Sequence, residues 1–334
     1  MPLNGRSMKA LYITRPAENS ESIQIDLIDR PIPVIGEGEC LIKVIASGIN
    51  PSDALGAIGH FNHVHFPRIP CRDFSGRVVD GPKHLIGKNV WGGGAGICSD
   101  GVGAEFIKLA PAEIAEIPTT LDPLIAGGQP LPYITAYYGL EKRAHIQPNE
   151  TVLVVGALGQ VGRAAMSICH YKKCKAIALV HGEKEVEKAK QLGWNVIDDE
   201  DKNLSEKILA ANEGRRVNVI LNSVGNAYWN ELIKSLSEFG RMVLIAGRPR
   251  VRETTLNLFD LYRENQDIIG INTLSFGFSE NAEMLRELKV GFETGQLLPL
   301  PIEPATIYAP EEASEAYRES MRPPSGRRIL IKFP

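Results

Sequence analysis

Three glycines spaced three residues apart form the pattern in this chain that points most directly to chemistry. Gly156, Gly159 and Gly162 follow the apolar run 151–155. In a loop of this kind the first glycine allows a tight turn, the second lets backbone N–H groups approach a pyrophosphate, and the third permits close helix packing. The N-terminus of the helix that follows adds unpaired donors and a partial positive charge. We therefore predict a cofactor-binding loop, rather than a ligand-free turn, made of Gly156, Leu158, Gly159, Gln160, Val161 and Gly162.

The end of the next apolar strand, 175–180, bears on which nucleotide this loop holds. Sites for NAD place an acidic residue at this point, where it accepts hydrogen bonds from the ribose hydroxyls. Here the strand runs into His181 and Gly182, so room is left for a 2′-phosphate, with His181 and Lys184 as its predicted partners. Glu183 lies close by, and its negative charge counts against a 2′-phosphate. His181, Glu183 and Lys184 could also be ordinary solvated charges at a helix start. NADPH is the predicted cofactor, and NADH is the alternative.

The elements that position this loop alternate between strand and helix from residue 150 onward. Continuous apolar strands separated by helices predict a parallel sheet covered on both faces, a doubly wound α/β fold with ligands at the carboxyl ends of its strands. Asn203 is the expected N-cap of one helix. The predicted strands are 151–157, 175–180, 195–199, 217–225 and 241–247, and the predicted helices are 160–172, 183–193, 203–212 and 226–240.

The N-terminal part has a different texture, with strands and many Gly and Pro turns. Apolar residues take helical spacing only near residues 122–144. The tail predicts a helix, a strand, a helix and a last strand that returns to the N-terminal part. The predicted N-terminal strands are 8–13, 39–49, 72–80 and 88–93, and 103–118 continues the pattern.

Length and composition exclude several classes of protein. A chain of 334 residues is long enough for two domains, and its net charge of −3 offers no basic surface for nucleic acid or anionic membrane. The first residues lack the apolar core of a signal peptide, and no apolar run reaches spanning length. The five cysteines include no CxxC pair, so neither a disulfide framework nor a structural zinc lobe is expected. A cytoplasmic location is expected.

Together, several segments give the chain its resemblance to the medium-chain dehydrogenase/reductase superfamily. Within that superfamily it is most similar to the zinc-independent quinone oxidoreductase branch. The resemblance implies a GroES-like β-rich catalytic domain (1–128 and 275–334) split around a Rossmann dinucleotide-binding domain (129–274), and a homodimer formed through the edge of the Rossmann sheet. The matching segments are "GINPSDALGAIGHF", "IPCRDFSGRVV", "PLPYITAYYGL", "NETVLVVGALGQVG", "VNVILNSVG" and "GRMVLIAG".

The same resemblance implies roles for individual residues. Asn50 and Asp53 match a loop that forms the nicotinamide side of the active-site cleft, and Thr135 matches a threonine that approaches the nicotinamide ribose. Asn272 is expected near the nicotinamide end. Further residues expected to line the cofactor groove end two successive strands; they are Asn222, Gly225, Ala246 and Gly247.

The resemblance also shows what this chain lacks. Zinc-dependent relatives place a Cys where "INPSDA" stands and a His-Glu pair where "CRDFSG" stands, and this chain has Asn50, Arg72 and Asp73 at about those places. Cys71 lies one residue early and has no partners. Because these ligands are missing, we expect no zinc. Without a metal no Lewis acid polarises a carbonyl, so we expect a substrate whose carbon is already electrophilic.

Other polar residues have two interpretations each. His60, His63 and His65 could ligate a metal, but a loop that meets substrate or solvent is the plainer interpretation. Arg72 and Asp73 are expected to form a structural pair. Tyr133 could donate a proton or a hydrogen bond to a substrate oxygen, or it could be a packing residue.

These observations predict an NADPH-dependent oxidoreductase that transfers a hydride to a small molecule, a quinone or an α,β-unsaturated carbonyl compound. The predicted catalytic residues are Asn50 and Asp53, whose loop would hydrogen-bond the oxygen of the reduced product, and Tyr133. The alternatives are a non-catalytic NADPH-binding redox sensor, an enoyl-thioester reductase, and an alcohol dehydrogenase with an unconventional metal site. The enoyl-thioester reductases carry a Tyr where this chain has His60 and Phe61, which disfavours that activity.

Overall fold

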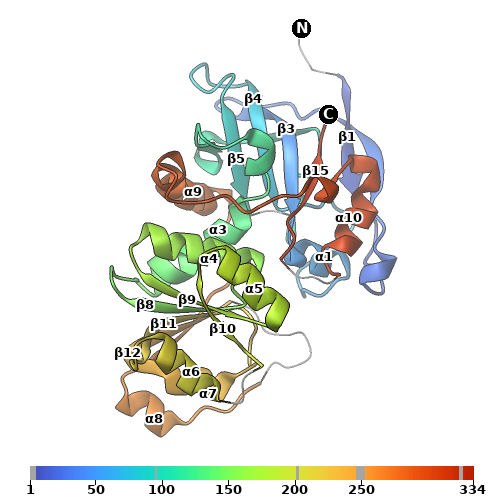
Figure 1. Ribbon diagram of the computed structural model, residues 1–334. Coiled ribbons are helices and arrows are strands. Elements are labelled where there is room, and N and C mark those ends of the chain that lie inside the picture. The colour runs from blue at the N-terminus through green and yellow to red at the C-terminus, as the bar shows by residue number, and fades with distance from the viewer. Residues whose placement is uncertain (1–4, 95, 201–202, 246–252, 323–325) are drawn as a thin grey trace. The chain divides into compact units, whose positions relative to one another are not determined.

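The computed structural model describes residues 5–94, 96–200, 203–245, 253–322 and 326–334. The chain divides into two compact units (Figure 1). Unit 1 comprises Met1–Ile134, Thr273–Gly295 and Pro299–Pro334, and unit 2 comprises Thr135–Asn272 and Gln296–Leu298. The first boundary falls inside helix α3 (Pro130–Tyr137).

Unit 2 is built on a six-stranded sheet in which every neighbouring pair is parallel. Its order is β10-β9-β8-β11-β12-β13, so β8 and β11 flank the point where the strand order reverses. Every residue of β8 is buried, as expected for a strand covered on both faces. The strands are β8 (Thr151–Val155), β9 (Lys175–Val180), β10 (Asn195–Asp198), β11 (Val217–Asn222), β12 (Leu236–Leu244) and β13 (Asp267–Gly270).

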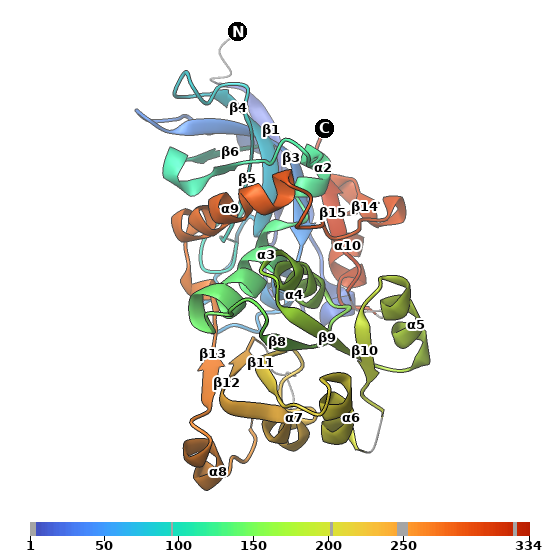
Figure 2. The same ribbon diagram turned by 60° about the vertical axis from the view of Figure 1, so that its left-hand side comes forward.

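Helices cover both faces of this sheet, which confirms the predicted doubly wound fold. Figures 1 and 2 show α4 and α5 on one face and α6 and α7 on the other. Buried Ile208 of α6 and Leu232 of α7 share a core with Leu153 and Ile220 of the sheet. The helices are α4 (Gln160–Tyr171), α5 (Glu183–Gln191), α6 (Leu204–Ala211), α7 (Trp229–Ser235) and α8 (Leu258–Arg263).

Unit 1 contains a mostly antiparallel sheet in the order β14-β15-β3-β4-β5-β7, with β6 also paired to β3. The last strand pairs with β3, which confirms that the tail returns to the N-terminal part. The strands are β1 (Ser7–Tyr12), β2 (Asp26–Pro31), β3 (Cys40–Ile49), β4 (Asp73–Asp80), β5 (Asn89–Gly93), β6 (Phe106–Leu109), β7 (Ala115–Glu116), β14 (Ile307–Tyr308) and β15 (Ile329–Lys332). The helices are α1 (Pro51–Ala57), α2 (Pro123–Ala126), α9 (Phe278–Glu293) and α10 (Ala313–Glu319).

One predicted helix is wrong over half its length. The apolar spacing of 226–240 predicts a helix to Gly240, but α7 ends at Ser235 and β12 begins at Leu236. Leu236 is fully buried and pairs with Val217, so the strand pairing overrides the local helical pattern. Between this pair and the next the register shifts, and exposed Phe239 takes a left-handed φ of 57°.

Asn203 is the N-cap residue of α6, but its side chain makes no cap hydrogen bond; it donates instead to Glu206 Oε2 at 3.3 Å. The predicted cofactor residues Ala246 and Gly247 lie outside the described residues. Within the described chain, no helix has the length and apolarity needed to cross a membrane.

Candidate functional site

The glycine loop of unit 2 follows β8 at the point where the strand order reverses, which is where doubly wound sheets bind ligands. Gly156 has a φ of 75°, a left-handed conformation that glycine adopts without strain. A Cβ at Gly162 would collide with the carbonyl oxygen of Gly156 and lie 2.7 Å from the Cα of Ala157. The first glycine therefore makes the turn, and the third lets α4 pack directly against the loop.

Helix α4 begins at Gln160 with Gly159 as its N-cap, and no side chain caps its first turn. In any helix the first N–H groups lack intrahelical partners, and the N-terminus carries a partial positive charge. A glycine cap with no side chain leaves that end open to an anion. The loop therefore has the shape and the donors that fit the pyrophosphate of a dinucleotide.

A second turn meets the glycine loop at the same edge of the sheet. Asn222 ends β11, donates to the carbonyl oxygen of Gly225 at 2.7 Å, and accepts from the N–H of Val224 at 3.0 Å. Ser223 donates to the carbonyl oxygen of Val155 at 2.7 Å. A Cβ at Gly156 would lie 2.8 Å from Ser223 Oγ. The structure thus brings Gly156 and the Asn222–Gly225 turn together, as the resemblance implies. Thr135 is buried, whereas Asn272 is exposed.

The end of β9 is more acidic than its own sequence suggests. His181 is mostly exposed, and its Nδ1 lies 2.7 Å from Asp199 Oδ1. Its backbone N–H donates to Glu185, and the N–H of Gly182 donates to Asp198 Oδ1 at 2.9 Å. The hydrogen bond to Asp199 raises the pKa of His181. Glu185 belongs to α5, but Asp198 ends β10 and Asp199 follows it, so the residues next to β9 in the sequence do not reveal these two carboxylates.

In unit 1, Asn50 and Asp53 lie together at the start of α1, a helix where the sequence predicts only a loop. Pro51 occupies the first helical position, which suits its fixed φ. Asp53 Oδ2 accepts the N–H of Asn50 at 2.8 Å and its side-chain Nδ2 at 3.1 Å. Asn50 Nδ2 also donates to Asp73 Oδ2 at 3.0 Å. Both residues are almost fully buried, and their hydrogen bonds fix the helix start on the sheet.

The expected Arg72–Asp73 pair is wrong, because Asp73 pairs with a residue from the far end of the chain. Arg328, which precedes β15, places Nη2 2.8 Å from Asp73 Oδ2 and donates Nη1 to Asn50 Oδ1 at 3.0 Å. Asp73 also accepts the N–H of Leu131 at 3.1 Å. Arg72 points elsewhere, toward Ser52 Oγ at 3.2 Å and the carbonyl oxygen of Thr273 at 3.5 Å. The sequence signal for Arg328 is slight, an arginine just before an apolar strand.

The residues that correspond to zinc ligands in relatives do not fit a metal. The side-chain Oδ1 of Asn50 and the Asp73 carboxylate already accept from the Arg328 guanidinium, which is itself a cation. A zinc ion at this point would have to displace Arg328 and bind without thiolate or imidazole. Across the described residues, no three or more His, Cys, Asp and Glu side chains are grouped as metal ligands, the His60–His65 loop included.

Two other features of unit 1 bear on the candidate residues. Tyr133 is fully buried, and its ring packs edge-on against Phe292 with centroids 4.8 Å apart, so its environment is that of a packing residue.

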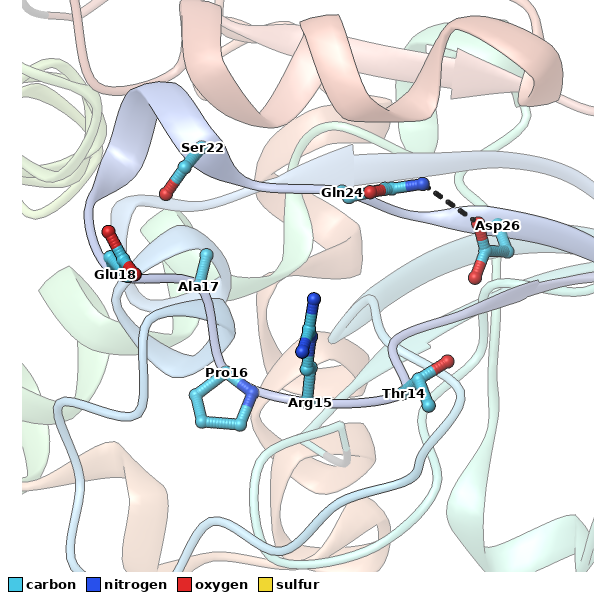
Figure 3. Close-up of a pocket in the computed structure, with 8 residues that line it drawn as sticks. All are labelled: Thr14, Arg15, Pro16, Ala17, Glu18, Ser22, Gln24 and Asp26. Carbon is cyan, nitrogen blue, oxygen red and sulfur yellow. Dashed lines mark hydrogen bonds between the residues drawn. The ribbon is translucent and has the colours of Figure 1, made fainter.

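A surface pocket of about 490 Å³ holds none of the predicted site residues (Figure 3). The Arg15 side chain points into it, and Gln24 donates to Asp26 at 3.5 Å. The residues that line it are Thr14, Arg15, Pro16, Ala17, Glu18, Ser22, Gln24 and Asp26.

Burial of Asp53 makes the stability of the protein depend on pH. Burial raises the pKa of Asp53 to about 6, against the lowering effect of Arg72. Because the pKa is about 3.9 in unfolded chains, the folded state holds this proton more tightly. Its contribution is fully present below about pH 4 and is lost as the pH rises through about 6, a change of about 3 kcal/mol.

Asp53→Asn removes this titration and keeps an oxygen to accept the Asn50 N–H. Between pH 4 and pH 8 the wild type should lose about 3 kcal/mol of unfolding free energy that the variant does not lose. The variant should therefore gain stability relative to the wild type by that amount as the pH rises. Urea unfolding at several pH values measures it. A constant difference across that range would contradict the raised pKa.

Comparisons with known proteins agree with this architecture. Residues 161–289 match the family model for zinc-binding dehydrogenases, and residues 36–119 match the alcohol dehydrogenase GroES-like domain. The chain is similar to a zinc-type alcohol dehydrogenase-like protein of Schizosaccharomyces pombe (31% identity, 97% of each chain) and to a quinone oxidoreductase of Pongo abelii (26% identity, 91% of this chain and 92% of that one). An alcohol dehydrogenase superfamily protein from Novosphingobium aromaticivorans has a similar structure (TM-score 0.85, 25% identity, 97% of this chain and 99% of that one).

A doubly wound sheet with a glycine loop at its switch point, together with a GroES-like β-rich unit, defines a class of nucleotide-dependent oxidoreductases. This chain belongs to the medium-chain dehydrogenase/reductase superfamily. It is therefore an oxidoreductase, and membership of the family implies that it binds NAD(P).

Proposed function

We propose that this protein reduces quinones or α,β-unsaturated carbonyl compounds with NADPH and without zinc. One observation carries the proposal. The Arg328 guanidinium donates hydrogen bonds to Asn50 Oδ1 and to Asp73, two residues at about the positions of the zinc ligands in zinc-dependent relatives. A simple carbonyl needs a Lewis acid to accept hydride readily, whereas a carbon made electrophilic by conjugation does not. Quinones and α,β-unsaturated carbonyl compounds therefore suit a site in which Asn50, Asp73 and Arg328 bond to one another and not to a metal. Similarity to a quinone oxidoreductase supports the same choice.

The chain's contribution to such a reaction is binding and orientation. When bound, the nicotinamide supplies the hydride. The loop of Gly156 and Gly162 and the N-terminus of α4 would hold its pyrophosphate, and the Asn222–Gly225 turn would border the same groove. Thr135 and Asn272 are proposed on the resemblance alone to meet the nicotinamide half.

The structure changes the role that we propose for Asn50 and Asp53. Asn50 uses its N–H, Nδ2 and Oδ1 in hydrogen bonds to Asp53, Asp73 and Arg328. Asn50 therefore has no donor left for a substrate, and Asp53 is engaged through Oδ2 with Asn50, so we propose that both residues position the groups around them. Tyr133, packed in the interior of unit 1, is left out of the proposed proton transfer.

We propose NADPH as the reductant, although two features of the β9 edge act in opposite directions. The strand itself ends without a carboxylate, and exposed Lys184 with the protonated form of His181 would attract a 2′-phosphate. Asp198, Asp199 and Glu185 add negative charge beside them, which favours ribose hydroxyls and NADH. A comparison of kcat/KM for the two reductants decides between these effects.

Steady-state oxidation of NADPH and NADH with a panel of quinones, enones and simple ketones tests the proposal. We expect turnover of the quinones and enones, none of the ketones, a higher kcat/KM with NADPH, and no change when a chelator is present. Dependence on added zinc would indicate an alcohol dehydrogenase. Tight NADPH binding with no turnover of any substrate would indicate the non-catalytic sensor, and preference for an enoyl thioester would indicate that reductase activity.

The predicted homodimer and the cytoplasmic location stay predictions. Two features of unit 2 support a dimer through the sheet edge. Strand β13 is an edge strand of the six-stranded sheet. On the neighbouring helix α8, the side chains of Leu258, Phe259 and Tyr262 are 60–70% exposed, an unusual concentration of apolar surface.

A further inference from the structure

The buried charges of the described chain do not balance. Its buried charged side chains are three arginines and two aspartates, and all lie in unit 1. Burying an ion costs several kcal/mol unless it is paired and hydrogen-bonded. With both aspartates ionised, one guanidinium is left without a compensating charge, and protonation of Asp53 increases that excess. These residues are Arg68, Arg72, Arg328, Asp53 and Asp73.

Arg328 is not the arginine with capacity to spare. Its guanidinium donates to Asp73, to Asn50 Oδ1, to the carbonyl oxygen of Ile49 at 2.7 Å and to that of Gly128. Every one of these acceptors is buried or part of the backbone. Arg328 therefore has a complete structural role.

Arg72 is far less well satisfied. Its side chain is only 1% exposed, yet its two hydrogen bonds are long, 3.2 Å to Ser52 Oγ and 3.5 Å to the carbonyl oxygen of Thr273. Charge-assisted hydrogen bonds of this kind are normally about 2.7–2.9 Å. Its Nε has no hydrogen-bond partner among the residues that the structure describes. Burial lowers the pKa of Arg72, while the charge of Asp53 opposes that effect.

The backbone holds Arg72 in place, and the hydroxyl to which it donates belongs to a partly exposed residue. The carbonyl oxygen of Arg72 accepts the N–H of Gly94 at 3.1 Å, just before β4 begins. Ser52, whose Oγ accepts from the Arg72 guanidinium, is half-buried. Arg72 is thus a buried, fixed cation with an unused donor, beside half-buried Ser52 and adjacent in the sequence to Asp73 of the Asp73–Arg328 pair.

Among the three buried arginines of the described chain, Arg68 also has donors without a partner, but its surroundings are different. It donates Nη1 to the carbonyl oxygen of Gly96 and lies over the ring of Phe66, 5.5 Å from the centroid. The space beside Gly56 is closed by Arg68 Nη2 at 3.0 Å and by Ile97 at 2.9 Å from the position of an added Cβ. Nη2, one of its two donors without a partner among the described residues, thus lies in this tight packing against Gly56 and Ile97. Arg68 therefore serves as a matched control.

We propose that Arg72 is a catalytic residue that binds the substrate's carbonyl oxygen and stabilises the negative charge that hydride transfer puts on it. This inference rests on the proposed function. The hydride brings two electrons to the β-carbon, the electrons of the C=C bond shift toward the carbonyl, and its oxygen becomes an enolate or phenolate anion. Water then supplies the proton that completes the reduction. Preorganised donors aimed at such an oxygen contribute about 10²–10³-fold to kcat.

Kinetics of three variants of Arg72 and one control variant of Arg68 test this role. We expect Arg72→Met to lower kcat for an enone about 10²–10³-fold, with NADPH affinity unchanged, because the cofactor loop lies in unit 2. Arg72→Lys should keep the charge but lose the planar fork, and so recover only part of that loss. Added methylguanidinium should partly restore Arg72→Ala. The control Arg68→Met should lower the melting temperature but keep kcat per folded molecule and gain nothing from methylguanidinium.

A binding measurement keeps this test separate from turnover. 4-Nitrophenol, whose ionisation is visible by absorbance, is titrated with the NADP⁺-bound protein and with Arg72→Met. We expect the wild type to lower the pKa of the bound phenol by about 1–3 pH units and the variant to lose that shift. If the wild type binds the phenolate through Arg72 but reduces no substrate of the panel, the proposed function fails while the oxyanion site stands.

Three results would overturn the inference. The wild type could fail to bind the phenolate, or Arg72→Met could leave its pKa shift unchanged. Alternatively, Arg72→Met and Arg68→Met could lose activity and thermal stability equally, and methylguanidinium could fail to restore Arg72→Ala. That result would make Arg72 a structural residue.

Discussion

Replacing Arg328 with methionine is expected to lower the free energy of unfolding by about 3–5 kcal/mol. The change leaves Asp73, which is fully buried, without its cationic partner at 2.8 Å. It also removes the donors to Asn50 Oδ1 and to the carbonyl oxygen of Ile49, which tie the start of α1 to β15. The cost is that of an uncompensated buried carboxylate. Urea unfolding at neutral pH measures it.

Two further variants separate charge from packing. Arg328→Met combined with Asp73→Asn removes both charges, so we expect it to regain a large part of the lost stability. Arg322→Met is the control, because Arg322 pairs with Glu21 and Glu315 at partly exposed positions, where ion pairs contribute less than in the interior. Equal losses in Arg328→Met and Arg322→Met would show that burial of the Asp73 pair has no special weight.

Replacing Gly162 with alanine is expected to weaken NADPH binding at least about 10²-fold. An added Cβ would collide with the Gly156 carbonyl oxygen and approach the Ala157 Cα to 2.7 Å, and neither backbone atom can move without shifting the loop. The N-terminus of α4 would be displaced from the position that receives the pyrophosphate. Fluorescence titration with NADPH measures the effect.

The matched control for this variant lies in the same unit. Gly270, at the end of β13, has nothing within 4 Å of the position of an added Cβ. Gly270→Ala should therefore bind NADPH as the wild type does. If Gly162→Ala also retained wild-type affinity, the loop after β8 would not be the cofactor site.

Local patterns suffice to predict most of unit 2. The apolar strands and the spacing of Gly156, Gly159 and Gly162 are short-range features, and they predict the parallel sheet and the loop at its switch point. The same patterns fail at 226–240, where pairing of Leu236 with Val217 overrides helical spacing. They also miss Asp198 and Asp199, which reach Gly182 and His181 respectively only because β10 lies beside β9.

The buried cluster of unit 1 is not predictable in this way. The ion pair between Asp73 and Arg328 joins residues 255 positions apart. Neighbouring residues suggest instead a pair between Arg72 and Asp73, because adjacent opposite charges are the simplest match. Only the return of β15 to β3 brings Arg328 to Asp73 and leaves Arg72 with donors to spare.

Transfer of label from the cofactor tests the central claim most directly. The protein is incubated with an enone and NADPH deuterated at the transferred position of C4, in the presence of a chelator, and the product is examined by NMR. We predict one deuterium on the β-carbon of the saturated ketone and none on the α-carbon, which takes its proton from water. Absence of deuterium from the β-carbon, or reduction that occurs only when zinc is added, would contradict the account.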